Sequence, residues 1–127
     1  MLLDTNVLVR HLTGQPLAQA RRATKFLRTA EHLELPDLIV AELVYVLESV
    51  YARPRSEVAA VARSVLAMGA VEVADERLLL RAVELYETHR IDFAEAYLAA
   101  QAEAGDGLVA SFDRGLDRVA DIQRVEP

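Results

Sequence analysis

Short apolar runs alternate along this chain with longer segments in which apolar residues recur every three or four positions. The apolar runs cover residues 2–3, 33–36, 70–73, 107–110 and 122–125. Runs of this length, bounded by turn or capping residues, are typical of buried strands. The segments at 15–30, 37–51, 56–68, 75–89 and 92–104 have the spacing of amphipathic helices.

Capping residues mark the ends of several predicted helices. Pro36 and Asp37 start the second helix, Ser56 and Asp75 stand as N-caps of the next two, and Gly105 stops the last. Short apolar strands that alternate with helices predict an α/β fold with a mostly parallel central sheet of about five strands. Helices flank the sheet, and residues 1–127 form one domain.

Composition narrows the class of protein. The 127 residues are 53% hydrophobic, carry a net charge of -6 and include no cysteine. The absence of cysteine excludes disulfide scaffolds, thiolate zinc sites and cysteine nucleophiles. No apolar run approaches the roughly 20 residues of a membrane span, and no basic export signal opens the chain, so we expect a cytoplasmic protein. The acidic balance argues against a protein that coats nucleic acid, although nucleic acid remains possible as a substrate.

Two carboxylates follow predicted strands, at the edge where a parallel sheet binds its ligands. Asp4 comes directly after the first strand and before a short helix that Thr5 or Asn6 could cap. Asp113 comes two residues after Ser111, at the end of the fourth strand. An aspartate at a helix start also serves as an N-cap, which is the structural alternative for Asp4.

Glu42 is the only charged residue in the apolar run from Leu38 to Leu47. We expect this carboxylate to be partly desolvated whichever way the helix turns. A buried charge of this kind is normally protonated, paired or bound to a metal. The alternative is a side chain that reaches solvent beside Glu48 or pairs with an arginine.

Asp92 and Glu95 stand three residues apart in the first turn of the last helix. This spacing matches a capping box, which accounts for both residues without any chemistry. In a parallel sheet, however, they and the other three acids would converge on one cluster. Oxygen ligands of this type suit Mg²⁺ or Mn²⁺, and such a site hydrolyses phosphodiesters through metal-bound water.

These motifs together resemble the PIN domain over essentially the whole chain. They are Asp4-Thr5-Asn6, Glu42, the Ala-x-x-Ala-Ala helix after Glu95, and Ser111-Phe112-Asp113. The compact length resembles a VapC-type toxin. The resemblance implies a Mg²⁺- or Mn²⁺-dependent endoribonuclease, the toxin of a toxin-antitoxin pair. It also implies a homodimer bound by an antitoxin protein that blocks the site.

The resemblance assigns roles to individual residues. Asp4, Glu42 and Asp113 match three of the acidic positions of the family, as catalytic metal ligands. Glu95 stands where the family most often has Asp, with Asp92 one turn earlier, and both remain candidates for the fourth ligand. Residues placed to hold carboxylates or waters are Thr5, Asn6 and Ser111. The change to Glu keeps a second reading open, a PIN-like domain with weakened or lost catalysis that acts as a binding or regulatory module.

Partner surfaces also follow from the sequence. Candidate RNA contacts are Arg114, beside Asp113, and the cations of the first two helices, Arg10, Arg21, Arg22, Lys25 and Arg28. A homodimer face or antitoxin groove is expected from the apolar residues Leu43, Val46, Val50, Val61, Val65, Leu66 and Met68. The alternative is that this apolar set is all intramolecular core.

A phosphoacceptor receiver domain is the rival from another class, because it also gathers acids at strand ends and binds Mg²⁺. Such a domain is expected to have adjacent acids after its first strand and a lysine after its last. Here the first strand is followed by Asp4 alone, and the only lysine is Lys25, on an early helix. The residues therefore favour the nuclease.

Overall fold

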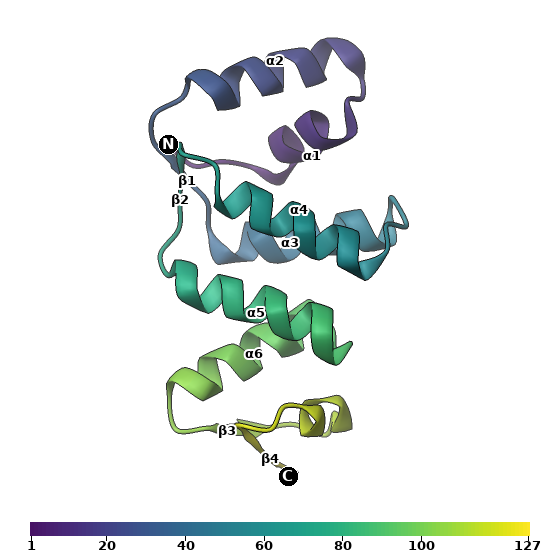
Figure 1. The fold of residues 1–127 in the computed structure, drawn as a ribbon, viewed down its shortest axis with the longest axis vertical. Coiled ribbons are helices and arrows are strands. Elements are labelled where there is room, and N and C mark those ends of the chain that lie inside the picture. The colour runs from purple at the N-terminus through teal and green to yellow at the C-terminus, as the bar shows by residue number, and fades with distance from the viewer.

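The computed structural model describes residues 1–127, and the chain forms a single α/β domain of six α-helices and four short strands (Figure 1). The helices are α1 (Thr5–Thr13), α2 (Leu17–Thr29), α3 (Asp37–Ser49), α4 (Arg55–Leu66), α5 (Glu76–His89) and α6 (Phe93–Ala104). The strands are β1 (Leu33–Glu34), β2 (Val71–Glu72), β3 (Leu108–Ala110) and β4 (Gln123–Val125), with a 3-10 helix, η1 (Arg114–Arg118), between the last two.

The strands form two separate parallel sheets of two strands each. β1 pairs with β2, and β3 pairs with β4. Leu2 adds a single parallel bridge to Glu34 of β1, and the Leu3 N–H donates to the Glu34 carbonyl at 2.9 Å. The expected strand positions and parallel direction are confirmed, but the expected central sheet of about five strands is not formed. Strands of two or three residues offer few backbone hydrogen bonds, so helix packing dominates the fold.

The helices stack in pairs along the long axis of the molecule (Figure 1). α1 and α2 lie at one end, α3 and α4 come next, and α5 and α6 follow. β3 and β4 lie at the opposite end, whereas β1 and β2 lie beside the N-terminus. Leu2, which lies shortly before Asp4, bridges to the β1–β2 sheet, whereas Asp113 follows β3 of the other sheet. The two aspartates therefore follow different sheets.

Two helix starts, those of α1 and α4, differ from the sequence prediction in the identity of the cap. Pro54, not Ser56, stands at the N-cap of α4. Asp4 itself caps α1, so neither of the two residues after it serves as the cap. Asp75 is confirmed as the N-cap of α5, since its side chain accepts from the Leu78 N–H at 3.1 Å. Gly105 is confirmed at the C-cap of α6.

One buried cluster of 29 residues forms the core, and Tyr86 is its largest fully buried side chain. The Tyr86 hydroxyl donates to Glu48 Oε2 at 2.9 Å, and the Arg55 guanidinium lies 4.2 Å from the ring centroid. Phe93 packs edge-on against the same ring at 6.2 Å between centroids. The core thus joins α3, α4, α5 and α6 through one aromatic side chain.

The apolar set expected to form a dimer face or antitoxin groove is mostly core. Leu43, Val65 and Leu66 are buried, and the partly buried members packed against the core are Val46, Val61 and Met68. Only Val50 is exposed. Because α4 packs this side on α3 and α5, most of the set is taken up by the core, and a partner surface on its exposed and partly buried members stays a prediction.

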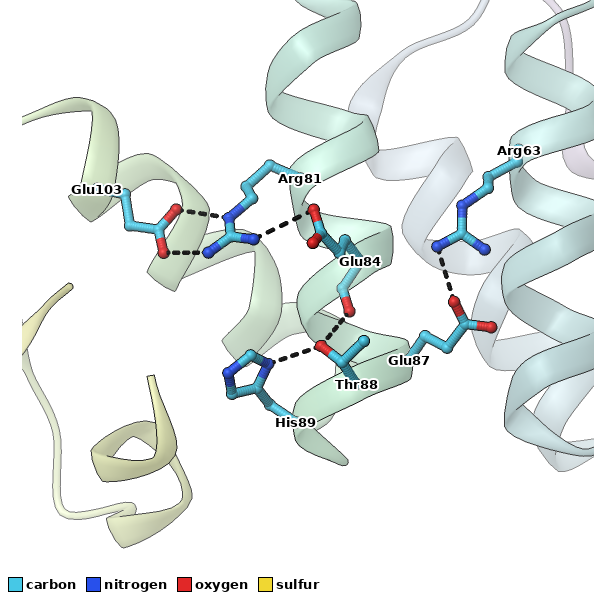
Figure 2. Close-up of polar contacts among 7 residues, drawn as sticks. All are labelled: Arg63, Arg81, Glu84, Glu87, Thr88, His89 and Glu103. Carbon is cyan, nitrogen blue, oxygen red and sulfur yellow. Dashed lines mark hydrogen bonds and ion pairs between the residues drawn. The ribbon is translucent and has the colours of Figure 1, made fainter. Parts of the chain in front are cut away.

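Ion pairs on α5 connect it to its two neighbouring helices (Figure 2). Arg81 forks onto Glu103 of α6, with Nε and Nη2 each 2.8 Å from a carboxylate oxygen. Arg63 of α4 donates to Glu87 at 2.8 Å on the other side of α5. The Arg81–Glu103 pair ties α6 to α5, and α6 carries the candidate acid Glu95 in its first turn and Asp92 at its N-cap.

Candidate active site

Asp4 and Glu42 form the first of two carboxylate pairs. Asp4 Oδ1 accepts the Thr5 N–H at 2.7 Å, in the manner of an N-cap. The Thr5 hydroxyl donates to Glu42 Oε2 at 2.5 Å. Thr5 is the only buried polar residue of the chain, at 5% exposure, so it is a fixed link between the two acids.

Glu42 is exposed to solvent, and the expectation of a desolvated carboxylate on α3 is wrong. α3 has a solvent-facing stripe that also carries Leu38 and Tyr45, which are 77% and 66% exposed. Because these two residues are apolar, the residue pattern does not predict that this side of α3 faces solvent. Glu42 therefore opens into a shallow pocket of about 280 Å³, which Asp4 and Thr5 also line.

Glu95 and Asp113 form the second pair. Glu95 lies in the first turn of α6, and Asp113 precedes η1, where its Oδ1 accepts the Gly115 N–H at 2.8 Å. Burial, together with a side-chain hydrogen bond to Asp113 and the charge of that carboxylate, raises the pKa of Glu95 to about 7. The same hydrogen bond from Glu95 lowers the pKa of Asp113. Below about pH 7 the pair holds one proton, which lies on Glu95 and is donated to Asp113.

The surroundings of the second pair include Asp92 and Ser111. Asp92 is the N-cap of α6, but its exposed side chain makes no capping hydrogen bond. Only half of the predicted capping box forms, because Glu95 accepts from the backbone of Asp92 while the reciprocal bond is absent. Ser111 Oγ accepts the Asp113 N–H at 2.9 Å, which fixes the backbone that carries this acid.

The structure does not bring the two pairs into the single cluster expected from the sequence. No three of the His, Asp and Glu side chains gather where they could hold one metal ion. The first pair follows the N-terminal segment that bridges to β1, whereas Asp113 follows β3, and the two sheets are not joined. Convergence would have required the N-terminal segment to pair with β3.

Asp37 and Tyr97 form the one side-chain hydrogen bond between α3 and α6. The Tyr97 hydroxyl donates to Asp37 Oδ2 at 2.5 Å, and this bond raises the pKa of Tyr97 to about 12. The other oxygen, Oδ1, is buried and has no partner. The sequence predicts Asp37 only as a helix start, yet Asp37 follows a strand, which is the same signal that points to Asp4.

Two arginines hold the corner that leads into α6, and neither was predicted. Arg55 Nη1 donates to the carbonyls of Tyr86 at 2.7 Å and Ile91 at 2.6 Å. Arg118 donates to the carbonyl of Arg90 at 3.0 Å. Hydrogen bonds to backbone carbonyls cannot be predicted from residue types, because every residue presents the same carbonyl acceptor.

The basic residues predicted to meet RNA lie on different parts of the surface. Arg10 lines the pocket that holds Asp4 and Glu42, and its Nε donates to Gln19 at 2.7 Å. Asn6 lines the same pocket, and its side chain makes no hydrogen bond within the protein. Arg114 is exposed next to Asp113 and forms no ion pair.

The donor chemistry of both pairs suits Mg²⁺ or Mn²⁺, because every donor is a carboxylate or hydroxyl oxygen. A proton held between two carboxylates occupies the place where a cation would bind, so the second pair fits such an ion chemically. Each pair alone offers two acids, and a fuller ligand set needs both pairs.

A sequence model of the family described as "PIN domain" matches residues 1–122. None of the curated proteins compared with the chain matches it. Separately, the helices of this chain are all too short or too polar to cross a membrane.

Proposed function

The chain belongs to the PIN-domain family, and from this premise we propose that it is a Mg²⁺- or Mn²⁺-dependent endoribonuclease that acts in the cytoplasm as a VapBC-type toxin. PIN domains are in general nucleases. The observation that carries the proposal is that four acids form two pairs: Asp4 is linked to Glu42 through Thr5, and Glu95 lies beside Asp113.

When bound, the metal supplies Lewis-acid polarisation of the scissile phosphate and a water of lowered pKa. Asp4 and Glu42 would hold it at the first pair, and Glu95 and Asp113 would hold it at the second, with Asp92 as the alternative to Glu95. The remaining task of the protein is to orient these acids. Thr5 fixes Glu42 through its hydroxyl, and the 2.5 Å bond gives that carboxylate one orientation.

The second pair holds a proton below about pH 7. Glu95 donates it to Asp113, so the two side chains lie together without the repulsion that two ionised carboxylates would suffer. Ser111 and Gly115 hold Asp113 through backbone bonds on either side of it. Loss of this proton would leave two negative charges facing a cation, which is the state suited to metal binding.

Arg10 and Arg114 are the proposed contacts to phosphate groups of the substrate. Arg10 lies in the pocket of the first pair, and Arg114 is the immediate neighbour of Asp113. Each pair of acids thus has one guanidinium beside it. Such an arrangement allows a polyanion to approach carboxylates that would otherwise repel it.

An antitoxin protein and a second copy of the chain are the proposed protein partners. Support comes from the solvent-facing stripe of α3, where Leu38 and Tyr45 flank Glu42. A partner that covers these apolar side chains would cover the Glu42 carboxylate too. Gel filtration of the chain alone and with the product of the neighbouring gene measures both associations.

The test of the enzymatic proposal is cleavage of single-stranded RNA by the purified chain with Mg²⁺ or Mn²⁺. We expect cleavage that EDTA stops and that Asp4→Asn reduces at least about 100-fold, with unchanged circular dichroism. A matched control is Asp106→Asn, an acid at an exposed turn after α6. The absence of metal-dependent cleavage from a folded protein would overturn the proposal.

That outcome would favour the second candidate function, a PIN-like module that binds RNA or protein without cleaving it. The observation in its favour is Glu95 itself, where the family most often has Asp. The variant Glu95→Asp distinguishes the two functions. Cleavage that appears only in Glu95→Asp would show that the natural chain has lost catalysis at this position.

A further inference from the structure

α1 and α2 together form a positively charged surface on an acidic protein. Residues 5–30 contain Arg10, Arg21, Arg22, Lys25 and Arg28, and all 20 acidic residues of the chain lie outside this segment. The whole chain nevertheless carries a net charge of -6. Five of the 14 Lys and Arg residues therefore form an acid-free, positively charged region at one end of the molecule, where Figure 1 places both helices.

The cations of α2 have no acidic partners within the protein. Arg21, Arg22, Lys25 and Arg28 are exposed, and none takes part in any of the ion pairs of the structure. From the first to the last, they span about 10 Å of helix. Like charges at this spacing repel one another, so the surface favours a ligand that carries several negative charges in a row.

A groove between α1 and α2 combines these cations with an aromatic ring. Its volume is about 870 Å³, and its lining includes Asn6, Arg10, Arg22, Lys25 and Phe26. Phe26 is 37% exposed, so part of its ring is accessible from the groove. Cations along a groove with an accessible ring are the features that bind single-stranded nucleic acid, because bases stack on the ring and phosphates meet the cations.

The groove is continuous with the candidate active site. Asn6 and Arg10 line the groove and also line the pocket that contains Asp4 and Glu42. A strand that lies in the groove therefore leads directly to the first carboxylate pair. Duplex RNA would not use Phe26, because its bases are stacked inside the helix.

We propose that the α1–α2 groove binds the single-stranded RNA that flanks the cleavage site, with one base stacked on Phe26 and its phosphates against Arg22 and Lys25. This inference rests on the proposed nuclease function and adds the path of the substrate. An acidic protein segment would satisfy the cations, but it has no need of an exposed phenyl ring. The ring is the reason to favour RNA.

The test is fluorescence anisotropy of a short labelled oligouridine with the full chain in EDTA, where no cleavage occurs. We expect Phe26→Ala to weaken binding about tenfold and Phe26→Tyr to leave it unchanged. With an abasic strand of the same length, Phe26→Ala should have no effect. This second probe separates stacking from any general damage to the protein.

The charges are tested by the double variant Arg22→Gln/Lys25→Gln. We expect the slope of log affinity against log salt to fall by about 1.4, since each phosphate contact on a single strand contributes about 0.7. The matched control is Arg53→Gln/Arg77→Gln, which removes two exposed cations, one from the loop before α4 and one from α5. The control should keep the salt slope of the unmodified chain.

Three results would overturn the inference. The first is an oligouridine affinity that neither groove variant changes, and the second is the absence of oligouridine binding by the unmodified chain. The third is an affinity for poly-glutamate that equals or exceeds the affinity for oligouridine and is lost in the same variants. RNA cleavage in Mg²⁺, measured separately, tells whether the nuclease proposal survives each result.

Discussion

Gly115 stands so close to Asp113 that a Cβ at position 115 would lie 3.1 Å from Asp113 Oδ1 and 3.4 Å from Glu95 Oε2. The backbone N–H of Gly115 uses that closeness, since it donates to the same Oδ1 at 2.8 Å. The absence of a side chain at position 115 is thus part of what allows the two acids to share a proton.

The variant Gly115→Ala should separate the second pair while leaving the fold intact. The new methyl group forces a shift of a few tenths of an ångström, and the exposed Asp113 side chain is free to make it. We expect about tenfold weaker Mn²⁺ binding by isothermal titration, with a change in unfolding free energy below about 1 kcal/mol. Gly69→Ala, whose Cβ would meet no atom within 4 Å, is the control. Equal Mn²⁺ affinity in both variants would contradict the role given to Gly115.

Replacing Thr5 should affect activity more than stability. Thr5→Val keeps the buried shape but removes the hydroxyl that holds Glu42 Oε2, and the exposed Glu42 then turns to water. We expect a loss of about 1 kcal/mol in unfolding free energy and about a tenfold loss in RNA cleavage rate. Thr5→Ser restores the donor and should recover most of the rate. Failure of Thr5→Ser to exceed Thr5→Val would show that the hydroxyl does not position Glu42.

Stability should depend on the protonation of Glu95. Its pKa is raised from 4.5 to about 7 in the folded protein, so between these values the folded chain holds a proton that the unfolded chain releases. The stabilisation by this proton is therefore complete below about pH 4.5 and is lost as the pH rises through about 7. The loss lowers the unfolding free energy by on the order of 2 kcal/mol. Urea unfolding at about pH 5 and about pH 8 in EDTA measures the loss. Glu95→Gln should remove it, and an identical pH dependence in this variant would argue against the shared proton.

The fork between Arg81 and Glu103 should stabilise the packing of α5 on α6. Glu103 has 16% of its side chain exposed, and Arg81 lowers its pKa below the usual 4.5. Its contribution is therefore present above pH 4.5 and lost as the pH falls through the lowered pKa. Glu103→Gln should reduce the unfolding free energy by about 1–2 kcal/mol near pH 7. Glu84, the other partner of Arg81, has 56% of its side chain exposed. Glu84→Gln should therefore change the unfolding free energy by less than about 0.5 kcal/mol.

The helices were predictable because each depends on its own residues. α2, α5 and α6 begin and end within two residues of their expected bounds, since helical spacing and capping groups are local signals. α3 shows the limit of this reasoning. Leu38 and Tyr45 face solvent, so hydrophobicity alone did not separate the two faces of the helix, and the exposure of Glu42 was missed.

The candidate site was predictable only in its local parts. The link from Asp4 through Thr5 and the turn around Asp113 depend on neighbouring residues, and the strand-end rule found both. The relation between the two pairs depends on whether the N-terminal segment pairs with β3, which is a non-local choice that no residue pattern records. For the same reason nothing in the sequence pointed to Arg55, which acts on carbonyls more than 30 positions away.

The separation of the α1–α2 cations from the acids gives the molecule an electric dipole along its long axis. At distances beyond a Debye length, a polyanion meets only screened charge, and at closer range most of the surface repels it. Encounter complexes in which RNA first contacts α1 and α2 therefore last longer than those in which it first contacts the acidic surface. The direction in which RNA arrives is selected before any base is read, and the same field turns the molecule so that its basic end meets the strand first.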